Sequence, residues 1–158
     1  MPYRISDQYI KDEKFAEIAI IKKAMEIISS STQKCVRFVE RSNETDYIFI
    51  TRGFACNSNV GRDGGRQIVS LMRGCLEEIG AIQHQLLHAL GFYHEHSRAD
   101  RDDYVWIKWD NIRPTAIDDF KIQTDADSLG LPYDYSSVLH YPWNAFYKSD
   151  DVCSREIT

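Results

Sequence analysis

The chain has 158 residues, of which 43% are hydrophobic and 27% are charged, and its formal net charge is −5. This composition is that of one globular domain with its own hydrophobic core. The negative charge balance excludes the basic footprint of a nucleic-acid-binding protein, and no apolar run reaches the ~20 residues of a transmembrane helix.

The first elements are a short strand and a long helix. Tyr3–Ser6 has a strand pattern, and from about Asp12 to Ser29 the apolar residues recur every three or four positions, which is the helical period. Cys35–Glu40 and Tyr47–Thr51 are rich in Val, Ile, Phe and Tyr, which favours strands. The sequence therefore predicts strands and a main helix early in the chain.

The middle of the chain contains a loop, a strand and a second main helix. Gly53–Gly65 is rich in glycine and asparagine and is predicted to be a loop. Gln67–Met72 is predicted to be a strand, and Glu77–Gly91 a helix. Trp109–Phe120 is predicted to be helical from about Asp110, and the chain after Gln123 is predicted to be irregular.

The most informative segment is HQLLHALGFYH, from His84 to His94. His84 and His88 are four residues apart, so a helix presents both imidazoles on one face, one turn apart. Gly91 allows the helix to end and the chain to turn, so that His94 can approach the other two. Three neutral imidazoles around an open fourth position are the ligand set of a catalytic zinc ion.

Two histidines at this spacing are, by themselves, more typical of a solvated face or a core pair than of a metal site. The added glycine and third histidine at fixed offsets make the pattern specific, and four of the five histidines fall between His84 and His96. The sequence therefore predicts one bound zinc ion.

The residues that follow extend this pattern to a family. His94 continues as HEHSRADRD, and YDYSSVLHY runs from Tyr133 to Tyr141. These segments closely resemble the astacin family of zinc metalloendopeptidases, a branch of the metzincins, with the pattern HExxHxxGxxHExxRxDRD followed by a turn SxMHY. The resemblance covers the chain from about Pro2 to about Lys148.

The resemblance implies an α+β, zincin-like fold. Its upper half, residues 1 to about 91, is expected to hold a twisted sheet with two main helices. Its lower half, about 92–158, is expected to be irregular, with the zinc cleft between the halves. The whole chain, 1–158, would be a single peptidase domain, truncated at both ends.

The resemblance also assigns roles at the site. His84, His88 and His94 match the zinc ligands. Tyr141 matches a tyrosine near the metal that serves as a fifth ligand or stabilises the transition state. Leu139 takes the place of the methionine beneath the zinc, a mild change because Leu and Met have similar volumes.

Glu95 and the charged residues after it have structural roles by the same resemblance. Glu95 matches the carboxylate that receives the mature N-terminus, and in this chain we expect it to lack that partner. A buried carboxylate without a partner is costly, so Glu95→Gln would be neutral or mildly stabilising. Arg98, Asp100, Arg101 and Asp102 are expected to form a salt-bridge cluster that fixes the chain after His94.

Gln85 departs from the family in the position that matters most. The motif H-E-x-x-H has a glutamate there as general base, whereas a neutral amide cannot take a proton from metal-bound water. The amide can still hydrogen-bond that water, so the geometry survives and the activity is expected to be lost or strongly reduced. Such a change is that of a natural pseudoenzyme or of an engineered substrate trap.

Two alternatives remain open. One is a working secreted endopeptidase that tolerates Gln85. The other is a non-catalytic module that holds a peptide or glycoprotein segment without cutting it. In each case the partner is a peptide or protein rather than nucleic acid or a membrane.

The four cysteines, Cys35, Cys56, Cys75 and Cys153, have no C-x-x-C spacing, which argues against a thiolate zinc site. Four cysteines allow three connectivities, and the resemblance selects Cys56 with Cys75. It pairs Cys35 with a C-terminal cysteine, for which Cys153 is a possible substitute. Disulfides and the family indicate a secreted, extracellular protein, although the polar opening MPYRISDQ contains no signal peptide.

Overall fold

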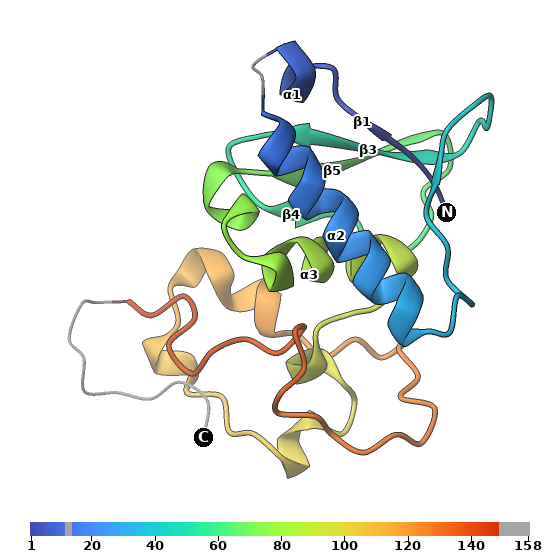
Figure 1. The fold of residues 1–158 in the computed structure, drawn as a ribbon. Coiled ribbons are helices and arrows are strands. Elements are labelled where there is room, and N and C mark those ends of the chain that lie inside the picture. Colours follow the sequence, from blue (N-terminus) through green and yellow to red (C-terminus); the bar gives the residue numbers. More distant parts are fainter. Residues whose placement is uncertain (12–13, 149–158) are drawn as a thin grey trace. The chain divides into compact units, whose positions relative to one another are not determined.

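The computed structural model describes residues 1–11 and 14–148. By internal contacts the chain divides into two compact units, Met1–Phe92 and a second that begins at Tyr93. The first unit combines a sheet with helices, and the described part of the second consists of short 3₁₀ segments and loops (Figure 1).

The sheet of the first unit has five strands in the order β2-β1-β3-β5-β4. All neighbours are parallel except β4, which is antiparallel to β5. Alternate residues of β3 and β5 are buried, as expected for a sheet with one covered face. The strands are β1 (Pro2–Ile5), β2 (Val39–Glu40), β3 (Tyr47–Arg52), β4 (Asn57–Ser58) and β5 (Arg66–Leu71).

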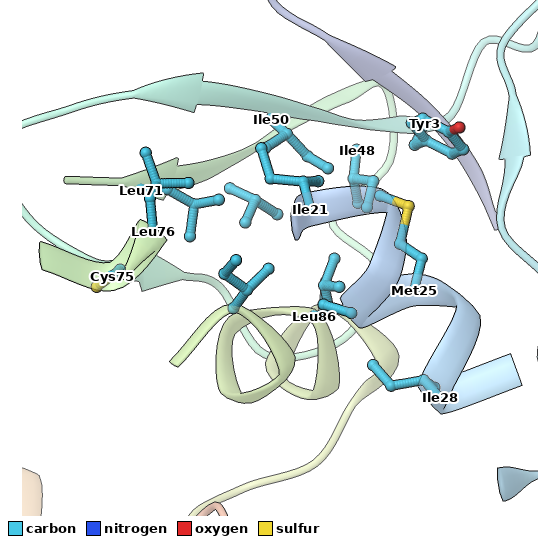
Figure 2. Close-up of a cluster of buried hydrophobic side chains, with 14 of the residues drawn as sticks. Tyr3, Ile21, Met25, Ile28, Ile48, Ile50, Leu71, Cys75, Leu76 and Leu86 are labelled. Atoms are coloured by element: carbon cyan, nitrogen blue, oxygen red, sulfur yellow. The ribbon is translucent and has the colours of Figure 1, made fainter. Parts of the chain in front are cut away.

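Two long helices pack on one face of this sheet, α2 (Phe15–Ser31) and α3 (Ile79–Leu90), while α1 (Gln8–Lys11) is a single turn (Figure 1). The 3₁₀ segment η1 (Arg73–Leu76) leads from β5 into α3. Each long helix buries residues three and four positions apart, the spacing that places side chains on one face. Figure 2 shows the resulting core between strands and helices.

This core determines the rotation of α3. Ile82 and Leu86 are fully buried in the core cluster of the first unit. At about 100° per residue, positions two further along point to a different side of the helix. His84 and His88 therefore lie together on a face that the core does not occupy.

The described part of the second unit contains four 3₁₀ segments and a smaller core. Val105, Ile107, Ile112, Phe120 and Tyr133 are buried in that core, together with Ala116. Within the described residues, no helix is long and apolar enough to span a membrane. The segments are η2 (Glu95–Ser97), η3 (Arg101–Asp103), η4 (Trp109–Asn111) and η5 (Pro114–Phe120).

The sequence predictions hold for most of these elements, and three were wrong. The loop predicted over Gly53–Gly65 contains the short strand β4, in which Asn57 and Ser58 pair with Ser70 and Val69 of β5. The strand predicted over Cys35–Glu40 is limited to Val39–Glu40, because α2 ends in a turn in which Gln33 and Lys34 take positive φ values of 51° and 64°. The helix predicted over Trp109–Phe120 consists of two 3₁₀ segments. Pro114 lacks an N–H and holds the residue before it in an extended conformation, which interrupts a continuous helix.

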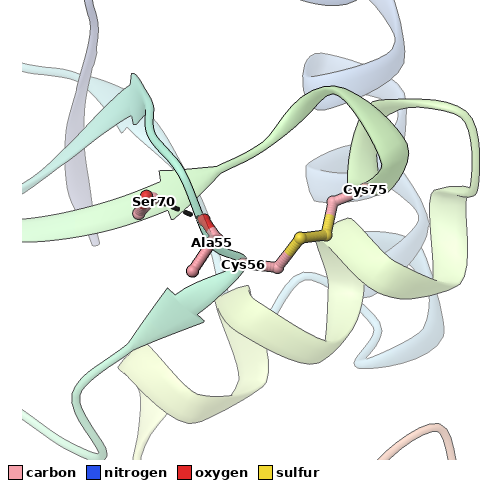
Figure 3. Close-up of a disulfide and its surroundings, with 4 residues drawn as sticks. All are labelled: Ala55, Cys56, Ser70 and Cys75. Atoms are coloured by element: carbon pink, nitrogen blue, oxygen red, sulfur yellow. Dashed lines mark hydrogen bonds between the residues drawn. A yellow bond between two sulfur atoms is a disulfide. The ribbon is translucent and has the colours of Figure 1, made fainter.

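A disulfide joins Cys56, before β4, to Cys75 in η1, with their Cα atoms 6.4 Å apart (Figure 3). The pairing predicted from the family resemblance is therefore confirmed. The Ser70 hydroxyl donates to the Ala55 carbonyl at 2.9 Å and holds the same segment against β5. Cys35 is exposed, and its suggested partner Cys153 lies outside the described residues, so that pairing stays a prediction.

We expect the double variant Cys56→Ala/Cys75→Ala to lose about 3 kcal/mol of unfolding free energy. The reason is that the crosslink closes a segment of 19 residues and so restricts the unfolded chain. Urea unfolding followed by circular dichroism measures the loss. The matched control is Ser31→Ala, at an exposed position of α2, which should change stability by less than about 0.5 kcal/mol. Equal losses for the two would contradict the assignment.

Candidate metal centre

The helix α3 ends at Leu90, two residues after His88, and Gly91 is its C-cap. Gly91 takes φ 106°, a left-handed conformation that strains any residue with a Cβ. Its N–H donates to the His88 carbonyl at 2.8 Å, and the Phe92 N–H donates to the Leu87 carbonyl at 3.1 Å. These bonds satisfy the last helical carbonyls. The chain therefore leaves the helix three residues before His94.

The three predicted ligands are brought together. The Nε2 atoms of His84 and His88 are 2.9 Å apart. One ring nitrogen from each of His84, His88 and His94 lies within 4.8 Å of the others. Among the described residues, this is the group of His, Cys, Asp or Glu side chains that could hold a metal ion.

His88 is prepared for metal binding by its other ring nitrogen. Nδ1 lies 2.8 Å from the Phe92 carbonyl oxygen, so Nδ1–H is the donor and Nε2 keeps its lone pair. Burial lowers the pKa of His88, which favours the neutral ring that a metal requires. The Phe92 carbonyl belongs to the turn that ends α3. The same turn therefore ends the helix and orients the His88 ring.

Gln85 provides the test of whether a zinc ion with a bound water fits this site. It follows His84 on α3 and is 7% exposed, and its Oε1 has no hydrogen-bond donor among the described residues. A buried acceptor without a donor costs about 1–3 kcal/mol. Three imidazoles suit zinc, and a metal-bound water would supply the donor that Oε1 lacks. The residues present therefore fit the metal.

Tyr141 lies beside the third histidine. Its ring centroid is 4.4 Å from that of His94 and 4.1 Å from that of His96. Burial, and to a lesser extent the negative charge of Asp119, raise the pKa of Tyr141 to about 12. The phenol therefore keeps its proton at neutral pH and is a hydrogen-bond donor.

Leu139 is buried in the turn that carries Tyr141. Its carbonyl accepts a hydrogen bond from the Glu95 N–H at 3.0 Å, which ties this turn to the residue directly after His94. The backbone therefore couples the position of Tyr141 to that of His94.

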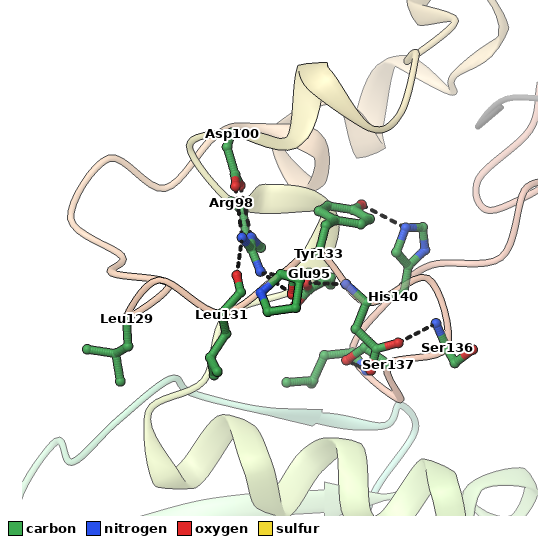
Figure 4. Close-up of polar contacts among 12 residues, drawn as sticks. Glu95, Arg98, Asp100, Leu129, Leu131, Tyr133, Ser136, Ser137 and His140 are labelled. Carbon is green, nitrogen blue, oxygen red and sulfur yellow. Dashed lines mark hydrogen bonds and ion pairs between the residues drawn. The ribbon is translucent and has the colours of Figure 1, made fainter.

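The expectation that the Glu95 carboxylate is left unpaired in the absence of its family partner was wrong. Its Oε1 accepts from Arg98 Nη1 at 3.0 Å and from the Asp134 N–H at 2.9 Å (Figure 4). The side chains of Glu95 and Arg98 are only 18% and 12% exposed. The carboxylate therefore links two loops of the second unit rather than standing alone.

The predicted salt-bridge cluster after His94 is confirmed. Arg98 also pairs with Asp100 at 2.8 Å, and Arg101 pairs with Asp102 at 2.7 Å. Arg101 is 4% exposed and donates to the carbonyls of His96 and Phe120 at 2.9 and 2.6 Å. These arginines crosslink loops of the second unit.

We expect Glu95→Gln to destabilise the protein by about 1–3 kcal/mol, because the change removes the charged acceptor that Arg98 and the Asp134 N–H share, while Arg98 keeps its pair with Asp100. Thermal or urea unfolding at neutral pH measures this. The matched control is Glu26→Gln on α2, whose ion pair with Lys23 is exposed and should contribute less than about 0.5 kcal/mol. A neutral or stabilising Glu95→Gln would restore the original expectation.

Sequence reasoning gave no role to two further histidines near Tyr141. His96 is fully buried, and its Nδ1 accepts from the Tyr141 N–H at 3.4 Å. His140 Nδ1 lies 2.7 Å from the Tyr141 carbonyl oxygen. Both contacts join a side chain to a backbone group, and the only sequence signal for them is that the two histidines lie within the motifs that carry the family resemblance.

Comparison with known proteins identifies the family. The model of the peptidase family Astacin matches residues 1–155. The chain belongs to the astacin family. Zinc is the metal of this family, and the three histidines of this chain form its ligand group.

Relatives in the astacin family share almost half of their aligned residues with this chain. The low choriolytic enzyme of Oryzias latipes is 46% identical over 149 residues, covering 94% of this chain and 52% of the relative. The zinc metalloproteinase nas-6 of Caenorhabditis elegans is 47% identical over 146 residues, covering 89% and 41%. The chain therefore spans about half the length of the curated relatives it matches, or less.

A solved astacin-family structure supports the fold. The high choriolytic enzyme 1 of Oryzias latipes, described as a hatching enzyme zinc-protease, superimposes with a TM-score of 0.88 at 42% identity. The match covers 100% of this chain and 74% of that structure. The expected α+β metzincin fold is confirmed.

Proposed function

We propose that this chain is an astacin-like zinc metallopeptidase domain whose own peptidase activity is lost or strongly reduced. The observation that carries the proposal is the pairing of an assembled three-histidine group with a glutamine at position 85. Gln85 is buried on the same helix as two of the histidines, and its oxygen has no donor among the described residues.

In this proposal His84, His88 and His94 hold the zinc ion. A bound zinc would supply Lewis acidity and an acidified water molecule. His88 is kept in the right tautomer by the Phe92 carbonyl. Tyr141, protonated at neutral pH, acts as a fifth ligand or donates a hydrogen bond to the oxyanion of the transition state.

The missing function is proton transfer. Gln85 Oε1 can accept a hydrogen bond from a metal-bound water and so hold it in place. It cannot take the proton or pass it to the leaving amine, because an amide is not basic at neutral pH. The site of this chain would bind a peptide in a nearly complete centre and fail at the chemical step.

We also propose a peptide or protein as the ligand and an extracellular location. The family acts on peptide bonds, and relatives at 42–47% identity include enzymes named as choriolytic or hatching enzymes. The Cys56–Cys75 disulfide requires an oxidising compartment to persist.

A cleavage assay with quenched generic peptides tests the proposal on the zinc-loaded chain, before and after treatment with a chelator. We expect one zinc ion per chain and no chelator-sensitive cleavage of the peptides. Chelator-sensitive cleavage at the rate of a Gln85→Glu variant would instead favour the working endopeptidase. Tight peptide binding measured by fluorescence anisotropy, without cleavage in either protein, would favour the binding module.

A further inference from the structure

The peptide groups on both sides of Tyr141 are bonded to imidazoles. On one side, the Tyr141 N–H donates to His96 Nδ1 at 3.4 Å. On the other, the Tyr141 carbonyl lies 2.7 Å from His140 Nδ1. Since a carbonyl only accepts, His140 must carry its proton on Nδ1, whereas His96 must leave its Nδ1 unprotonated.

The remaining ring nitrogens agree with these assignments. His96 Nε2 lies 3.2 Å from the Asp119 carbonyl oxygen, which requires Nε2–H. His140 Nε2 lies 2.7 Å from the Tyr133 hydroxyl, which then donates to it (Figure 4). The two histidines are therefore opposite tautomers, and each is fixed at both nitrogens by a group of the second unit.

Burial makes these assignments stringent. His96 is fully buried, with its ring centroid 4.1 Å from that of Tyr141 and 5.0 Å from that of His94. Tyr133 is 8% exposed and stacks on Tyr104 with ring centroids 4.7 Å apart. Water therefore has little access to His96 and to the Tyr133 hydroxyl, and a wrong tautomer of His96 would leave a buried polar group unsatisfied.

We propose that His96 and His140 form a clamp on the Tyr141 backbone and act as positioning residues for its phenol. The clamp fixes the Cα of Tyr141. The His96 ring also packs against the phenol ring of Tyr141 and the imidazole of His94. The consequence for catalysis rests on the proposed function of Tyr141, whereas the clamp itself does not.

Histidine tautomers measured by long-range ¹H–¹⁵N NMR test the clamp directly, at mildly alkaline pH where imidazoles are ordinarily neutral. We expect Nε2–H for His96 and Nδ1–H for His140. Tyr133→Phe removes the hydrogen-bond donor to His140 Nε2 and should shift the ¹⁵N resonance of that nitrogen, while the Tyr141 carbonyl keeps the proton on Nδ1. The control Tyr135→Phe removes a neighbouring hydroxyl that bonds the Tyr104 carbonyl, and should leave that resonance and both tautomers unchanged. The same tautomer for both histidines would overturn the clamp.

Kinetics in the Gln85→Glu background test the effect on Tyr141. The side-chain oxygen of Asn at position 96 can take the place of Nδ1 and accept from the Tyr141 N–H. The longer Gln side chain places its amide at the position of Nε2 instead. We expect His96→Gln to lower kcat by about 10- to 10²-fold with little change in KM, and His96→Asn to lower it less. Combined with Tyr141→Phe, His96→Gln should add almost nothing. Fully additive effects would contradict positioning.

These two tests separate the clamp from the proposed function. If a zinc-loaded Gln85→Glu variant showed no activity, the proposal that Gln85 causes the loss of activity would fail, and the tautomers would still decide the clamp. If the tautomers disagreed with the clamp while Gln85→Glu was active, the clamp alone would be rejected.

Discussion

We expect Gln85→Glu to raise peptidase activity by at least about 10²-fold over the unmodified chain. The metal ligands are assembled, Tyr141 lies beside His94, and α3 keeps its buried face. Glutamate has nearly the shape of glutamine, so it takes the same buried place and adds only a proton acceptor. Initial rates on a quenched peptide, with zinc supplied to both proteins, give the ratio.

The matched control for this prediction is Gln83→Glu. It introduces the same carboxylate two residues earlier on α3, at a partly buried position. We expect Gln83→Glu to leave activity unchanged, because its carboxylate is not at position 85, directly after His84, where the family has its general base. Equal activities of the unmodified chain and Gln85→Glu would show that another group serves as base. A silent Gln85→Glu that still holds zinc would place the defect elsewhere in the chain.

The second large effect is on metal binding. We expect His88→Ala to bind less than about half a zinc ion per chain under conditions in which the unmodified chain binds one. His88 supplies one of three nitrogens, and its ring is oriented by the Phe92 carbonyl. Zinc should also raise the thermal unfolding midpoint of the unmodified chain, since a ligand that binds only the folded state stabilises it. That rise should vanish in His88→Ala.

Elemental analysis and thermal scans with and without zinc measure both quantities. The control is Gln83→Ala on the same helix, which should retain full zinc content. Unchanged zinc content in His88→Ala would mean that the metal binds elsewhere, and the three-histidine centre would have to be abandoned.

Local patterns were sufficient to predict the metal centre and the main elements. The spacing of His84 and His88 acts through helix geometry alone, and Gly91 ends the helix through its own backbone freedom. The strand predicted over Tyr47–Thr51 from its β-branched and aromatic residues is β3 of the structure, in which alternate residues are buried. Each of these properties depends on residues within a few positions of one another.

Properties that depend on distant residues were not predicted. The partner of Glu95 includes the backbone of Asp134, 39 residues later, and no local pattern reports that contact. His96 and His140 have roles only because the chain returns to place Tyr141 between them. The family resemblance supplied the Cys56–Cys75 pairing, which cysteine spacing alone left among three possibilities.

The place of β1 in the sheet has a consequence for handling the protein. β1 consists of Pro2–Ile5, yet it lies between β2 and β3, and within the described sheet β2 pairs with no other strand. Removing those few residues would detach β2 and expose the edge of β3. An exposed apolar strand edge promotes pairing between molecules. Cleavage within β1 would therefore lead to aggregation without touching any zinc ligand.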